Sequence, residues 1–324
     1  MTGILKWEEY NMKKALVLGA SGGMGYSLVK ELSSREIKVV AFARTKEKLE
    51  RLFREDANVM IFAGDIFHKK DLAEAAKGVD IIFHSANIPY RDWEAKLLTL
   101  VSNIVEIAKT QSTKLAVVDN IYAYGRSPGE LITETTVKRP HTKKGKIRLQ
   151  AEKIIKNSGV PYVIAHFPDF YGPNAESTIL QYTLNGVMNN KKTRFVGNQS
   201  VAREFIFTPD GAKALVQLAL TDNAYGENWN IPGYNVITGE EIVSMLRDLT
   251  GYQKQASTVS KNMIRFLGLF NKDMREVVEM FYLNEEPVVL NGAKYEDIIG
   301  PVPRTSYQDG LSQTLDFMKR KSNL

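Results

Sequence analysis

A glycine-rich turn near the N-terminus constrains the fold of this chain more than any other feature. Residues 19–25 read GASGGMG, with glycines at the first, fourth and seventh positions of the turn. An apolar run at residues 15–18 precedes the turn, and a helical pattern at residues 26–33 follows it. A short strand, a tight glycine turn and a helix are typical of the first part of a βαβ unit.

Further apolar runs alternate with helical segments along the first half of the chain. Because these runs are continuously apolar, both faces of the sheet they form are expected to be covered. The pattern predicts an α/β fold, a Rossmann doubly wound parallel sheet, with its ligand site at the carboxyl ends of the strands. The expected strands are residues 38–43, 58–62, 80–83, 115–118 and 162–166, and the expected helices are residues 46–54, 71–76, 93–110 and 149–157.

The pattern changes after residues 171–173, where loops lengthen and amphipathic helices dominate, at residues 210–220 and 239–249. Residues 228–231 resemble a strand that returns to the sheet. We expect an N-terminal extension (1–11), an NAD(P)-binding Rossmann domain (12–172 plus about 205–235), and a smaller C-terminal substrate-binding lobe (173–204 and 236–324).

Composition excludes several classes of protein. The chain has no cysteine, which rules out disulfides, thiolate metal ligands and cysteine nucleophiles, and its four histidines lack metal-ligand spacing, so we predict no metal. No secretory signal and no apolar stretch of membrane-spanning length is present, so we expect a cytoplasmic protein without membrane association. The net charge is +6, but the basic cluster at residues 138–148 lacks interleaved aromatic residues, so nucleic-acid binding is not expected.

The glycine turn indicates a dinucleotide site. Glycine lets the backbone approach a pyrophosphate closely, and the start of the following helix offers free N–H groups and a positive dipole. The second strand ends at Phe42-Ala43-Arg44, without the acid that would bind the ribose 2′-hydroxyl of NAD. Arg44 can pair with a 2′-phosphate, which favours NADP over NAD; alternatively Arg44 is only a surface residue at a helix start. The predicted cofactor-binding residues of the turn are Gly19, Ser21, Gly22, Gly23, Met24 and Gly25.

Several short motifs follow the glycine turn along the chain. They are Gly64-Asp65-Ile66, His84-Ser85-Ala86, Tyr124-Gly125, Tyr171-Gly172-Pro173, Arg203-Glu204-Phe205, Asp210 and Gln308-Asp309-Gly310-Leu311. With these motifs the chain resembles the extended short-chain dehydrogenase/reductase family, which includes NAD(P)-dependent nucleotide-sugar epimerases and dehydratases. The resemblance implies that Asp65 and Ile66 flank the adenine, that Ala86 lies near the nicotinamide-side ribose, and that helices at about 93–110 and 146–157 form a homodimer.

The catalytic pattern departs from this family. The family uses a Ser or Thr near strand 5 and a Tyr-x-x-x-Lys pair, but alignment places Asn120, Lys144 and Arg148 at those positions. Lys144 and Arg148 share a helix face, where mutual repulsion and burial would favour a neutral lysine able to act as a base. Asn120 would then donate to a substrate carbonyl and Arg148 would hold a ribose or phosphate. Alternatively, the two cations belong to a solvated basic loop.

Other side chains are weaker candidates. Tyr122 and Tyr124 follow strand 5, and either is a possible replacement proton donor or a packing residue. Tyr90 and Trp93 are expected to wall a substrate pocket or to form a buried helix entry. Tyr171 begins the substrate lobe, and Arg203 is expected to bind an anionic substrate group or to form a structural salt bridge.

These features predict an atypical NADP-dependent oxidoreductase or epimerase-like protein. It would exchange hydride with a carbonyl or alcohol carbon of a small-molecule substrate, anionic or a nucleotide sugar, in the cleft between the lobes. The alternative is a non-catalytic NADP-binding redox sensor or regulator, which the loss of the Tyr-x-x-x-Lys pair favours.

Overall fold

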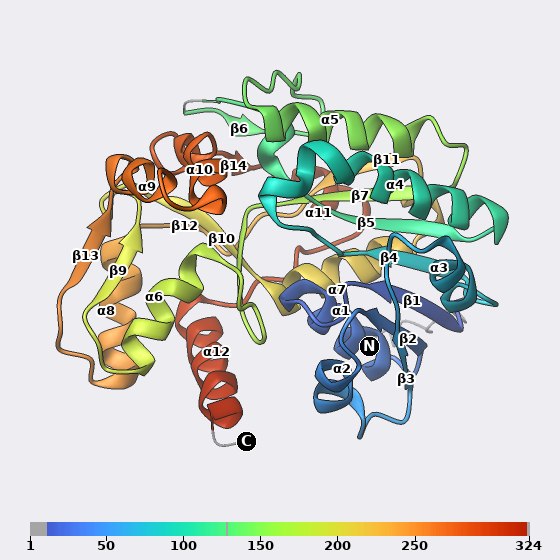
Figure 1. Ribbon diagram of the computed structural model, residues 1–324, viewed down its shortest axis with the longest axis horizontal. Helices are drawn as coiled ribbons and strands as arrows, with labels where there is room; N and C mark the ends of the chain where they lie inside the picture. The colour runs from blue at the N-terminus through green and yellow to red at the C-terminus, as the bar shows by residue number, and fades with distance from the viewer. Residues whose placement is uncertain (1–11, 128, 323–324) are drawn as a thin grey trace, which may run out of the picture.

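The computed structural model describes residues 12–127 and 129–322, so the expected N-terminal extension lies outside the described residues. Figure 1 shows a larger part built around one sheet and a smaller lobe beside it, with α12 (Tyr307–Ser322) near the junction.

Seven parallel strands form the central sheet in the order β3-β2-β1-β4-β5-β7-β11. The order reverses between β1 and β4, which is the point where doubly wound sheets bind ligands. The predicted α/β Rossmann fold is confirmed, and the expected returning strand at 228–231 is present as β11. The strands are β1 (Lys14–Leu18), β2 (Lys38–Ala43), β3 (Val59–Ala63), β4 (Ile81–His84), β5 (Lys114–Asn120), β7 (Tyr162–Phe167) and β11 (Glu227–Asn230).

Helices cover both faces of this sheet (Figure 1), which explains why its strands are continuously apolar. One core lies between the sheet and α1, α2 and α7, and the other lies between the sheet and α3, α4 and α5. Helix α5 begins six residues earlier than expected, because Thr142 caps it by accepting a hydrogen bond from the backbone of Gly145. The helices are α1 (Gly23–Ser34), α2 (Lys46–Phe53), α3 (Lys69–Ala75), α4 (Trp93–Thr110), α5 (Lys143–Lys156) and α7 (Thr208–Ala219).

The smaller lobe has a hydrophobic core of its own, which includes Phe195, Leu246 and Leu311. It contains the sheets β12-β10-β8 and β13-β9, while β14-β6 is a short separate pair. The strands are β6 (Leu131–Ile132), β8 (Asp169–Tyr171), β9 (Thr193–Val196), β10 (Arg203–Phe207), β12 (Val236–Ile237), β13 (Ala256–Val259) and β14 (Val289–Leu290). The remaining helices are α6 (Ile179–Met188), α8 (Gly239–Thr250), α9 (Lys261–Gly268), α10 (Lys272–Val278) and α11 (Ala293–Ile298), with short 3-10 turns η1 (Tyr90–Asp92), η2 (Ile121–Ala123), η3 (Asp222–Ala224) and η4 (Phe281–Asn284).

Candidate cofactor and active site

The glycine turn packs so closely that a Cβ would clash with backbone atoms at Gly19, Gly23 and Gly25. Gly19 has φ +82°, and a Cβ there would lie 2.7 Å from the Cα of Ala86. A Cβ on Gly25 would lie 2.1 Å from the carbonyl oxygen of Gly19. The turn is held to the sheet by hydrogen bonds from the N–H groups of Gly19 and Ala20 to the carbonyl of Phe42.

The start of α1 fits an anionic group. Gly22 precedes the helix and is exposed, no side chain caps the first turn, and the first turn contains no acid. Asn174 lies against the turn and donates from its amide to the carbonyl of Ser21 at 3.1 Å, while its buried Oδ1 has no partner within the described residues. These uncapped N–H groups and the close backbone approach fit the diphosphate of a dinucleotide.

Arg44 lies exposed at the end of β2, with no ion pair to any residue that the structure describes. The nearby Lys48 instead pairs with Glu176 at 3.2 Å, and Lys321 pairs with the same carboxylate. Asp65 accepts a hydrogen bond from the backbone of Phe67 at 2.9 Å, and Ile66 is buried beside it. Arg44 therefore remains available to a ligand at this end of the sheet.

A pair of tyrosine hydroxyls lies at the carboxyl ends of β4 and β5. The hydroxyls of Tyr90 and Tyr122 are 2.5 Å apart, and both side chains are half-buried. Asn120 shapes the turn, because its Oδ1 accepts the backbone N–H of Tyr122 at 3.0 Å. Burial raises the pKa of Tyr90 to about 12 and the pKa of Tyr122 well above its ordinary value. Both phenols therefore carry their protons at neutral pH.

Lys144 is surrounded by acids from the smaller lobe. Its Nζ donates to Glu276 at 2.5 Å and to Glu279 at 2.8 Å, and its side chain is 2% exposed. The expected neutral-lysine base rests on repulsion by Arg148 on the same helix, without these two carboxylates on and beside α10. The base role of Lys144 stays a prediction.

Arg148 lies behind the tyrosine pair and is also buried. Its guanidinium stacks over the ring of Trp93 at 4.5 Å and pairs with Asp119 at 3.4 Å. Trp93 is 1% exposed and donates from its indole to the carbonyl of Ile88. Lys144 and Arg148 are both buried, so they do not belong to a solvated basic loop. Trp93 packs against Tyr90 and Tyr122 as part of a buried helix entry.

A second charged cluster, which sequence reasoning did not find, lies under α5. Asp119, Glu152 and His166 place ligand atoms within 4.8 Å of one another. However, the ammonium of Lys138 pairs with Glu152 and lies 2.7 Å from Nε2 of His166, so a lysine side chain provides the cation of this cluster. Burial alone would raise the pKa of Glu152. The hydrogen bond from His166 and the charge of Lys138 outweigh burial and hold this pKa well below its usual range.

Three other predicted site residues are buried in structural contacts. The hydroxyl of Tyr124 donates to Asn230 at 3.0 Å, as expected for a packing residue. Tyr171 is 1% exposed and packs against aromatic rings of the smaller lobe. Arg203 is 3% exposed and hydrogen-bonds Asn284 and the carbonyl of Val196. Both side chains are buried in these contacts, and the substrate-binding roles expected for Tyr171 and Arg203 stay predictions.

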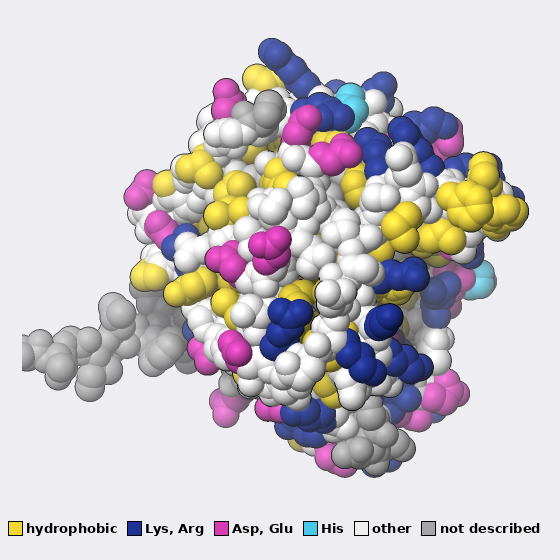
Figure 2. All heavy atoms as spheres, turned by 90° about the vertical axis from the view of Figure 1, so that its left-hand side faces the viewer, with side chains coloured by type: hydrophobic (Ala, Val, Ile, Leu, Met, Phe, Trp, Pro, Cys, Tyr) yellow, Lys and Arg dark blue, Asp and Glu magenta, His cyan; other side chains and the backbone are white. Residues whose placement is uncertain are grey.

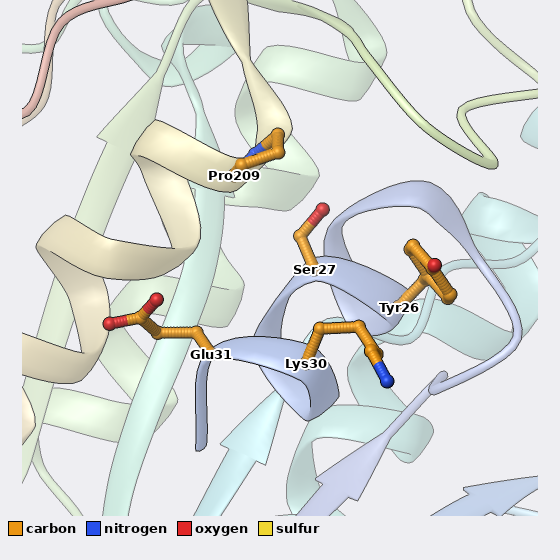
Figure 3. Close-up of a pocket in the computed structure, with 5 residues that line it drawn as sticks. All are labelled: Tyr26, Ser27, Lys30, Glu31 and Pro209. Carbon is orange, nitrogen blue, oxygen red and sulfur yellow. The ribbon is translucent and has the colours of Figure 1, made fainter. Parts of the chain in front are cut away.

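Two surface features bear on partners. A hollow lined by Tyr26, Ser27, Lys30, Glu31 and Pro209 lies between α1 and the start of α7, and Figure 3 shows Ser27 pointing toward the turn that carries Pro209. The charges of Lys30 and Glu31 are already paired, so this hollow is no candidate site. Helices α4 and α5 carry half-buried apolar residues, among them Leu98, Val105 and Leu149, and the homodimer expected through these helices stays a prediction. No helix in the described parts is long and apolar enough to cross a bilayer.

Residues 19–206, from the glycine turn to β10, match the NAD(P)H-binding family. An uncharacterized UDP-glucose epimerase of Bacillus subtilis is 25% identical over 263 residues, which cover 74% of this chain and 82% of that protein. The fold is shared with a UDP-glucuronic acid 4-epimerase from Bacillus cereus, solved with UDP-glucuronic acid and NAD (TM-score 0.78, 20% identity, 95% and 99% of the chains covered). It is also shared with a dTDP-glucose 4,6-dehydratase from Bacillus anthracis (TM-score 0.78, 18% identity, 96% and 97% covered).

The fold, the turn and the family match define a dinucleotide-binding protein with a second lobe. The chain belongs to the NAD(P)H-binding family, and it shares its fold with nucleotide-sugar epimerases and dehydratases.

Proposed function

We propose that this protein is an NADP-preferring oxidoreductase that reduces a carbonyl group of a small-molecule substrate. When bound, the cofactor supplies the hydride. The observation that carries the proposal is the hydroxyl pair of Tyr90 and Tyr122 at the ligand edge of the sheet. This pair lies at the carboxyl ends of the strands, where doubly wound sheets bind their ligands.

Tyr122 is the proposed proton donor. When hydride reaches a carbonyl carbon, the oxygen becomes an alkoxide and takes a proton from the nearest acid. The raised pKa of Tyr122 keeps its proton in place until such a strong base develops.

Asn120 and Arg148 are the proposed supporting groups. The Oδ1 of Asn120 is used by the backbone of Tyr122, which leaves its amide Nδ2 as a donor toward a substrate oxygen. The charge of Arg148 partly opposes the effect of burial on both tyrosines by lowering their pKa values, although burial outweighs it. Asn120 is thus assigned to orienting the substrate, and Arg148 to tuning the tyrosine pair.

The substrate class and cofactor preference have different support. Solved proteins that share the fold were crystallised with UDP-glucuronic acid or UDP-glucose together with NAD, which favours a nucleotide sugar as the substrate. The unpaired Arg44 at the end of β2 favours NADP, because a guanidinium matches a 2′-phosphate and an NAD site usually places an acid there.

The direct test is consumption of NADPH and NADH against nucleotide-4-keto sugars, simple ketones and aldehydes. With an active substrate, Tyr122→Phe should lower kcat by at least about 100-fold, the range for loss of a positioned acid. Tyr182→Phe, at a half-exposed position on α6, is the matched control and should leave kcat unchanged. Full activity of the Tyr122→Phe enzyme would refute the assignment.

A non-catalytic NADP-binding sensor is the second candidate. Lys144 occupies the position where the family has its catalytic tyrosine, and it is held in ion pairs with Glu276 and Glu279. The loss of the tyrosine at this position favours a sensor without catalytic activity. Saturable NADP binding without turnover on any substrate of the panel, together with the same binding by Tyr122→Phe, would support the sensor over the reductase.

A further inference from the structure

The largest gathering of exposed apolar side chains lies on α9 and the turn that follows it. We call it the apolar knob. Five of the twelve large hydrophobic residues that are exposed in the described chain fall within eight consecutive positions here. Figure 2 shows hydrophobic side chains protruding at the right of the view, at the height of α9. The knob consists of Met263, Phe266, Leu267, Leu269 and Phe270, which are 39%, 63%, 45%, 69% and 81% exposed.

The knob is not part of the core of the lobe. On α9 only Ile264 and Gly268 are buried, and Ile264 joins a small cluster with Val259 and Phe281. The opposite side of the helix therefore projects its apolar residues into solvent. A contiguous exposed apolar patch of this kind marks an interaction surface.

Unpaired cations border the knob. Arg265, Lys272 and Arg275 are exposed, and none of them has a carboxylate partner within the described residues. Among the neighbouring acids, Asp273 pairs with Arg91 at 2.6 Å, while Glu276 and Glu279 share the single ammonium of Lys144 and retain one negative charge between them, against three free cations. The surface around the knob is therefore apolar at its centre and positive at its margin.

This charge pattern distinguishes between the possible binding partners of the apolar knob. A second copy docking through the same face would bring its three cations against these three, and like charges at an interface oppose association. An anionic lipid surface instead matches both the apolar centre of the knob and the cations at its margin. Its headgroups attract the cations, and its acyl boundary accepts Phe and Leu side chains.

We propose that α9 and the following turn dock this protein onto an anionic lipid surface. The mode is that of an interfacial helix lying in the plane of the headgroups, which needs no membrane-spanning helix. This proposal departs from the expectation of no membrane association, which rested on the lack of a membrane-spanning stretch. Helix α10 follows directly and borders the Lys144 cluster, so the docked face lies one helix away from the candidate active site.

The test uses the full chain and sedimentation with vesicles of phosphatidylcholine alone or mixed with phosphatidylglycerol. We expect at least tenfold stronger partitioning onto the anionic vesicles, weakened by added salt. The double variant Phe266→Ser/Phe270→Ser and the charge variant Arg265→Glu/Lys272→Glu should each lower this partitioning at least tenfold. Met60→Gln removes a half-exposed apolar side chain from β3 and should not change it.

Circular dichroism of each variant shows whether the fold is intact, and the charge variant tests the proposal even if the serine variant misfolds. Equal partitioning of wild type onto both vesicle types, or no loss in the folded charge variant, would overturn the proposal. A dimer in light scattering that Phe266→Ser/Phe270→Ser converts to a monomer would instead assign the knob to a second copy.

Discussion

Replacing Glu152 by glutamine should destabilise the protein severely without touching the glycine turn. One carboxylate oxygen of Glu152 pairs with Lys138, and the other accepts from Asn228 at 2.9 Å and from Lys156 at 2.7 Å. The side chains of Glu152 and Lys138 are 4% and 9% exposed. Glutamine keeps the shape but removes the charge, so the ammonium of Lys138 stays buried without its counterion.

Breaking a buried ion pair from one side is expected to lower the free energy of unfolding by about 3–5 kcal/mol. Equilibrium urea unfolding at pH 7 measures this difference. The matched control is Glu50→Gln, whose carboxylate pairs with Lys46 at 3.4 Å on the surface of α2 and is 45% exposed. Its loss should be below about 1 kcal/mol, as for other exposed pairs.

The pH dependence provides an independent check. The pKa of Glu152 is held below its ordinary value of 4.5 in the folded state, so its contribution to stability is present above that pH and is lost as the pH falls toward the folded pKa. The difference between wild type and Glu152→Gln should therefore narrow in acid. A loss at pH 7 no larger than that of Glu50→Gln would refute the claim that the buried charge stabilises this network.

Two further predictions concern other charged groups. Arg44→Asp should weaken NADP binding relative to NAD by about 10- to 100-fold in fluorescence titrations, because one charge-assisted contact to the 2′-phosphate is lost; unchanged dissociation constants would contradict the NADP preference. Burial raises the pKa of Glu204 to about 7 although the N–H groups of Gly233 and Leu290 donate to it. Because the folded pKa lies above the unfolded one, the stability from this group is greatest below pH 4.5 and declines up to pH 7, by about 3 kcal/mol at about 1.4 kcal/mol per pKa unit. Glu204→Gln should remove that decline in unfolding measured across this range, and an unaltered pH slope would show that Glu204 does not titrate there.

Local pattern was sufficient for the sheet and for the start of α1. Gly19 and Gly25 could be recognised because a turn between a strand and a helix needs residues without a Cβ at those points, and the structure shows the close approaches that require it. The continuous apolar strands implied helices on both faces for a similar reason, since burial on two sides leaves no polar positions along a strand. The family resemblance added the prediction of a second lobe after the Rossmann domain.

The chemistry of the site depended on tertiary contacts. Tyr90 and Tyr122 are 32 positions apart, and Lys144 is 132 positions from Glu276, so no spacing in the sequence relates them. The Lys138 ammonium likewise meets Glu152 and His166 only because a loop, α5 and β7 converge. Sequence by itself determined the glycine turn and the strands of the central sheet, because those depend on neighbouring residues. Only the tertiary structure decided which charges are neutralised, because a buried charge takes its counterion from whichever element the fold brings beside it.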